Sequence, residues 1–155
     1  MLNAVWQLRV GYQEIALAFL CILACWRGAA PERWIAGAYA AIWGLDRLYH
    51  LAVPHGLFWL KVDLGHCAID LVGFAIIAGV AFKANRIYPL CLGALQLMVL
   101  MSHVVRGLNP EEALGAYQIL SLAPSYLLIA VFALGLLAHM RRHRKFGPYR
   151  SWQIS

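Results

Sequence analysis

Residues 57–82 read LFWLKVDLGHCAIDLVGFAIIAGVAF, and this stretch decides the fold. It is longer than the ~20 residues that an α-helix needs to cross ~30 Å of hydrocarbon. Its ionisable side chains gather toward its N-terminal end: Lys61, Asp63, His66 and Asp70. Ionisable groups inside a membrane span are expensive, usually face the interior of a helix bundle and often mark a working site. The stretch therefore predicts a membrane helix that carries part of a polar site.

The whole chain has the composition of an integral membrane protein. It has 155 residues, of which 63% are hydrophobic and 13% charged, and its mean hydropathy is +0.67. A soluble domain would carry about 25% charged residues. The sequence therefore predicts an all-α fold, a polytopic transmembrane helix bundle. Five spans joined by short loops are expected at residues 11–26, 34–53, 57–82, 87–108 and 114–140.

The segments between these spans are short and contain glycine, proline, asparagine and basic residues. Connections of this length favour consecutive spans that pack as antiparallel neighbours. We therefore expect one integral membrane domain over residues 1–155. The first residues lack the basic region of a cleaved signal peptide, so the first span is expected to remain uncleaved.

The distribution of basic residues predicts the orientation of the bundle. Nine of the 13 lysines and arginines fall on the side of the C-terminus: Arg27, Arg33, Lys83, Arg86, Arg141, Arg142, Arg144, Lys145 and Arg150. The positive-inside rule then predicts an inner-membrane protein with a cytoplasmic C-terminus and, for five spans, an N-terminus outside. The basic cytoplasmic tail, residues 141–155, should attract anionic lipid. No nucleic-acid binding is expected.

Helical periodicity places polar side chains on one face of each of four predicted spans. The four sets are Asp46 with His50; Asp63, His66 and Asp70; Gln96 and His103 with Arg106; and Gln118, Ser121 and Ser125. The turn at residues 54–56 makes a hairpin, so His50 and Asp63 should lie at similar depth. We therefore expect the sets to converge in the extracytoplasmic half of the bundle.

Two of these sets contain a carboxylate and an imidazole one helical turn apart, Asp46 with His50 and His66 with Asp70. This spacing suits a divalent metal ion with nitrogen and oxygen ligands. It equally suits a histidine that a carboxylate orients. The predicted metal ligands are Asp46, His50, His66 and His103, and the predicted catalytic residues are Asp63, His66 and Asp70.

The order Asp46, His50 and then His66 resembles the Asp-x-x-x-His…His copper ligands of the C subunit of membrane copper monooxygenases. The resemblance covers these three residues, with a different spacing to the last histidine, and implies a copper ion. Two of His50, His66 and His103 could instead be the axial ligands of a haem, although a metal ion fits the residues better. The same side chains could instead form ion pairs with Arg47 and Arg106 that only fix the helix register.

Three functions are compatible with this pattern. The first is a metal-dependent or acid/base enzyme that acts on a lipid-like substrate. The second is an ion- or proton-coupled transport component, which would need a homo-oligomer to build a pathway. The third is an accessory or anchor subunit of a larger membrane complex, with or without haem. His139 and His143 are assigned to the basic end and not to the site.

Overall fold

The chain forms five helices in a computed structural model, which describes residues 2–53, 64–108 and 114–153, and their side chains at 11–53, 64–107 and 123–153. The helices are α1 (Leu2–Arg27), α2 (Ala30–Ala52), α3 (Leu64–Lys83), α4 (Tyr88–Leu108) and α5 (Leu114–Phe146). The prediction of an all-helical fold is therefore confirmed.

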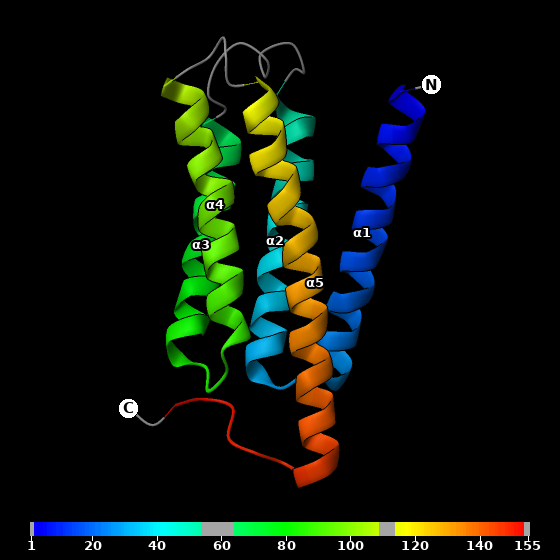
Figure 1. Ribbon diagram of the computed structural model, residues 1–155, viewed down its shortest axis with the longest axis vertical. Coiled ribbons are helices and arrows are strands. Elements are labelled where there is room, and N and C mark those ends of the chain that lie inside the picture. The colour runs from blue at the N-terminus through cyan, green and yellow to red at the C-terminus, as the bar shows by residue number, and fades with distance from the viewer. Residues whose placement is uncertain (1, 54–63, 109–113, 154–155) are drawn as a thin grey trace.

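The helices stand side by side along the long axis of the molecule (Figure 1). Each helix packs against the next one in the chain, and α5 also packs against α1. Figure 1 shows that α1 approaches the other helices at its C-terminal end and leans away from them toward its N-terminus. This arrangement leaves one side of α1 uncovered, and its exposed side chains include Ile15, Phe19 and Ile22.

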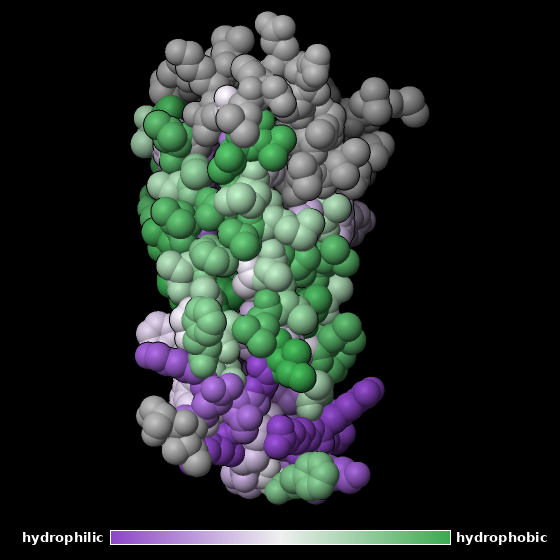
Figure 2. Space-filling view, turned by 60° about the vertical axis from the view of Figure 1, so that its left-hand side comes forward, coloured by the Kyte–Doolittle hydropathy of each residue, from purple (hydrophilic) through white to green (hydrophobic). Residues whose placement is uncertain are grey.

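Three helical segments are long and apolar enough to cross a membrane: Leu64–Lys83, Tyr88–Gly107 and Ala123–Phe146. The described parts of α1 and α2 contain no such segment, so the five predicted spans are not supported. Near its C-terminal end α2 carries Asp46, Arg47 and His50, and these polar side chains lower its hydropathy. Figure 2 shows a broad apolar belt above one end where hydrophilic side chains gather.

All five helices contribute to one hydrophobic core. Its fully or nearly fully buried members include Ala24, Ile35, Ile77, Leu92, Phe132 and Leu136. Tyr39 of α2 packs against Phe132 of α5 with 5.9 Å between the ring centroids. The core thereby fixes α2 between α1, α3 and α5, and α2 carries the polar residues described next.

The C-terminal segment turns back across one end of the bundle. Gly147 ends α5 with a φ of 72°, a left-handed conformation that glycine adopts at low cost. Residues 148–153 then reach the α3–α4 connection, where Trp152 and Ala84 form an antiparallel bridge. Two backbone hydrogen bonds hold it, from Asn85 to Ser151 (3.1 Å) and from Gln153 to Lys83 (2.8 Å).

Candidate metal centre

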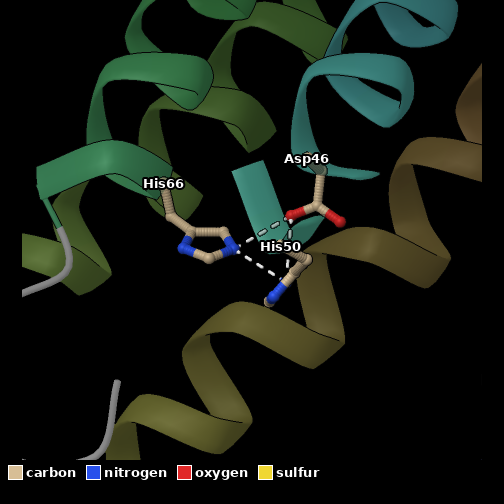
Figure 3. Close-up of side chains that lie close together, drawn as sticks. All are labelled: Asp46, His50 and His66. Atoms are coloured by element: carbon tan, nitrogen blue, oxygen red, sulfur yellow. Dashed lines mark hydrogen bonds and ion pairs between the residues drawn. The ribbon is translucent and has the colours of Figure 1, made fainter. Parts of the chain in front are cut away.

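Three of the predicted metal ligands meet where the C-terminal end of α2 lies beside the first turn of α3 (Figure 3). The Nε2 atom of His66 lies 2.9 Å from Oδ1 of Asp46 and 3.2 Å from Nε2 of His50. The same oxygen of Asp46 lies 3.7 Å from Nε2 of His50. One ligand atom from each of the three residues therefore converges on a common point.

Local structure explains this convergence. Asp46 and His50 are one turn apart on α2, so their side chains project from the same face. Opposite them, Gly65 packs so closely on the ring of Tyr49 that any Cβ at this position would clash with it. The Tyr49 ring in turn stands edge-on to the His66 imidazole, with 5.0 Å between centroids and 88° between planes. The close packing at Gly65 thus lets Tyr49 hold His66 toward α2.

The three side chains are only partly buried. The exposed fractions are 36% for Asp46, 37% for His50 and 25% for His66. The site lies at the end of the bundle opposite the basic C-terminal end of α5 (Figure 1). A metal ion and a small ligand could therefore reach it without unfolding the core.

The distances match those between ligand atoms around a single metal ion. Zinc binds imidazole nitrogen and carboxylate oxygen at ~2.0–2.2 Å, so neighbouring atoms of a tetrahedral site lie about 3.3 Å apart. The separations of 2.9, 3.2 and 3.7 Å lie on both sides of that value. Three protein ligands leave a coordination position open, as in catalytic zinc sites. Two histidines and one carboxylate are also the ligands of many non-haem iron sites.

A second polar set joins α3 and α4. Nε2 of His103 lies 3.0 Å from Oδ2 of Asp70, and the Gln96 side-chain amide donates to Oδ1 of Asp70 at 3.1 Å. Gln96 and His103 are 3% and 5% exposed, so this carboxylate is bound inside the bundle. His103, which the sequence predicted as a fourth metal ligand, thus lies with Asp70 and outside the group formed by Asp46, His50 and His66.

The remaining sequence predictions have other outcomes. Asp63, a predicted catalytic residue, lies outside the described residues, as do the side chains of Gln118 and Ser121. Arg47 forms an ion pair with Glu14 of α1 and so ties α1 to α2 beside the metal ligands. An ion pair between Arg47 and Asp63, the other possibility from the sequence, lies outside the described residues.

We expect His103→Ala to leave metal affinity within about twofold of the wild-type value, because His103 bonds Asp70 and lies outside the three-residue group. Isothermal titration of the purified protein with Zn²⁺ measures this affinity. Gln96→Ala, which removes the other partner of Asp70, is the matched control. A loss of tenfold or more in His103→Ala alone would make His103 a ligand, as the sequence predicted.

The sequence prediction missed a buried polar network at the opposite end of the bundle. Both carboxylate oxygens of Glu32 accept hydrogen bonds from Nη1 of Arg86, at 2.7 and 2.6 Å. The hydroxyl of Tyr88 donates to Glu32 at 3.0 Å. Nη2 of Arg86 donates to the hydroxyl of Tyr149 at 3.2 Å, and that hydroxyl lies 2.7 Å from Nδ1 of His139.

This network, Glu32–Arg86–Tyr88–His139–Tyr149, joins α2, the α3–α4 connection, α4, α5 and the C-terminal segment. Glu32 is fully buried and the Arg86 side chain is 7% exposed. His139, assigned by sequence to the basic end, is 5% exposed. One feature of the sequence indicated this network: Glu32 is the lone acid on the predicted cytoplasmic side, which holds most of the basic residues.

Comparisons with protein-family models, with characterised proteins and with solved structures give no match for this chain. The fold and the site define the class: an all-helical protein with three candidate membrane spans and a possible Asp/His/His metal site.

Proposed function

We propose that this chain is a small integral inner-membrane protein that binds a divalent transition-metal ion through Asp46, His50 and His66. The bound ion would serve hydrolysis of a lipid-like substrate in the extracytoplasmic half of the bundle. The observation that carries the proposal is the convergence of three ligand atoms at 2.9–3.7 Å, with coordination positions left open. An ion held by these residues would act as a Lewis acid and would activate a water molecule for attack on the substrate.

Residues beside the ligands supply a candidate acid/base group. Asp70 lies one helical turn beyond His66 on α3, and its two oxygens are oriented by Gln96 and His103. A carboxylate–imidazole pair in a buried site is well suited to accept and return a proton during hydrolysis. Asp63 remains a sequence prediction for the same role.

The surroundings favour a substrate that arrives from the bilayer. Large apolar side chains next to the ligands point outward: Leu48, Leu51 and Leu64 are 64%, 85% and 76% exposed. They precede or follow His50 and His66 by one or two positions, so they lie on other faces of α2 and α3 and present apolar surface at the depth of the ligands. A substrate dissolved in the bilayer would meet this apolar surface before it reaches the ligands.

The exposed side chains also support a location of all five helices in the membrane. The uncovered side of α1 presents Tyr12, Ile15, Phe19 and Ile22, each at least 63% exposed. Water would disfavour such a stripe, whereas lipid tails would solvate it. The hydrophilic end seen in Figure 2 would then face the cytoplasm and the metal site would face outward.

Transport is the second candidate. The buried Asp70–His103–Gln96 set lies deeper along α3 than His66, and ionisable chains of this kind occur in proton relays. A haem-binding subunit is less well supported, because the imidazoles of His50 and His66 converge on one point. Their ring centroids are 4.9 Å apart and their planes differ by 58°. Axial haem ligands must approach the iron from opposite faces of the macrocycle.

Reconstitution into vesicles of phosphatidylethanolamine and phosphatidylglycerol tests the enzymatic proposal. Zinc-loaded protein should release hydrolysed lipid, detected by mass spectrometry, while metal-free protein and His50→Ala should not. His143→Ala, an exposed histidine at the other end, should retain the activity. Absence of turnover with zinc, combined with a proton flux that Asp70→Asn abolishes, would favour transport and overturn hydrolysis.

A further inference from the structure

A cavity of about 700 Å³ lies between the α1–α2 turn and the last turns of α5, away from the metal site. It is distinct from the buried Glu32–Arg86–Tyr88–His139–Tyr149 network, although His139 and Tyr149 contribute to its wall. The charged side chains that line it are Arg27, Arg33, Arg141 and Arg144. We name these four residues and the space that they line the arginine pocket.

The arginine pocket is strongly cationic. Its four arginines, all exposed, come from three separate parts of the chain, and no acidic residue is among the described residues that line it. Glu32 lies at the same end of the molecule, but it is fully buried and both its oxygens bind Arg86. The positive charge of the arginine pocket is therefore not neutralised by a carboxylate among the described residues that line it.

Two of the arginines are held in place by contacts with their own turn. Nε of Arg33 donates to the carbonyl of Gly28 at 3.1 Å. The guanidinium of Arg27 lies 4.6 Å from the centre of the Trp26 ring, a cation–π distance. The turn itself is tight, since a Cβ on Gly28 would clash with the carbonyl of Ala24. The pocket is thus partly preorganised for an anion, which reduces the cost of binding.

The pocket also has an apolar side. Trp26, Leu137 and Met140 line it together with the arginines, and both Trp26 and Leu137 are exposed. Trp26 is the last residue but one of α1, and Leu137 and Met140 lie where the apolar part of α5 meets its basic last turns. Tryptophan and arginine are typical of this depth in membrane proteins, and basic pockets between helices there bind anionic headgroups.

We propose that the arginine pocket binds the phosphate of an anionic phospholipid, whose acyl chains lie along Trp26 and Leu137. Guanidinium groups suit this ligand because they bind phosphate oxygens in a bidentate manner. A free phosphate would satisfy the arginines but would leave the apolar wall uncovered. The inference goes beyond the proposed function and does not depend on the metal ion.

Native mass spectrometry of the protein in an uncharged detergent tests this proposal. Titration with phosphatidylglycerol should show one lipid retained in preference to phosphatidylcholine. Arg27→Gln/Arg141→Gln/Arg144→Gln should weaken phosphatidylglycerol binding about 100-fold, since each basic residue near an anionic surface contributes roughly fivefold. If this triple variant does not fold, Arg144→Gln alone should weaken it about fivefold.

Lys83→Gln/Lys145→Gln/Arg150→Gln is the matched control, because it removes the same charge from residues that do not line the arginine pocket. It should change the affinity less than threefold. An equal loss in both triple variants would show a diffuse charge effect and overturn the proposal. Displacement of the lipid by millimolar inorganic phosphate would make a soluble phosphate the ligand, which would also overturn it.

Discussion

His66→Ala should abolish stoichiometric zinc binding. The imidazole of His66 provides the nitrogen that lies nearest to both other ligand atoms, at 2.9 and 3.2 Å, and α3 supplies no other member of the group. Loss of a residue that merely supports a ligand costs 10–100-fold in metal affinity, so loss of a ligand should cost about 100-fold or more. Equilibrium dialysis followed by elemental analysis, with calorimetric titration, measures both stoichiometry and affinity.

His143→Ala is the matched control for that experiment. His143 is exposed on the last turns of α5, at the opposite end of the bundle, so the same substitution there should change zinc affinity less than twofold. His50→Ala should resemble His66→Ala, since it removes the other imidazole. Retention of one tightly bound zinc ion by His66→Ala would contradict the site.

Glu32→Ala should lower the stability of the fold more than any exposed substitution. It would leave the 7%-exposed guanidinium of Arg86 without its carboxylate and would remove the acceptor of the Tyr88 hydroxyl. Removal of one partner from a buried ion pair costs about 3–5 kcal/mol. For a chain of this length, that corresponds to a fall in Tm on the order of 10 °C, measurable by thermal unfolding in detergent.

Glu14→Ala tests whether the loss of stability in Glu32→Ala comes from the burial of its ion pair. Glu14 also pairs with an arginine, Arg47, but its side chain is 34% exposed and that of Arg47 is 52% exposed. Exposed pairs contribute less than about 1 kcal/mol, so Tm should change by only a few degrees. In Glu32→Leu/Arg86→Met, which leaves no uncompensated charge, much of the lost stability should return. Equal losses for Glu14→Ala and Glu32→Ala would contradict the account of the network.

The helices could be predicted from the sequence because their apolar segments are long and clearly separated. The segment predicted at residues 87–108 is α4 (Tyr88–Leu108), and α5 begins at the predicted residue 114. The last predicted span stops at residue 140 because hydropathy locates apolar surface and not the end of the helical backbone. The three arginines and the lysine of residues 141–145 are good helix formers, and α5 continues through them to Phe146.

The candidate site could be predicted only in part. Helical phase placed Asp46 and His50 on one face, and the α2–α3 packing brings His66 to them. Helical periodicity does not determine which side chains of neighbouring helices form contacts with one another. His103 contacts Asp70 and lies outside the group of Asp46, His50 and His66. The ligand group depends on the close packing of Gly65 on Tyr49, a contact that periodicity does not reveal.

The Glu32–Arg86–Tyr88–His139–Tyr149 network was beyond prediction for a different reason. It requires the C-terminal segment to return across the end of the bundle, so that Tyr149 meets Arg86, 63 positions earlier in the chain. Local patterns carry no information on such a return. The sequence indicated that Glu32, the lone acid among basic residues, would need a basic partner. It did not indicate which arginine would form the ion pair.

X-ray absorption spectroscopy of the zinc-loaded protein tests the central claim most directly. The four cysteines are free thiols and are the natural competitors for the ion. If Asp46, His50 and His66 hold it, the first shell should contain only nitrogen and oxygen at ~2.0–2.2 Å, with the multiple-scattering signature of two imidazoles. A sulfur shell at ~2.3 Å, or a first shell without imidazole, would contradict the proposed metal centre.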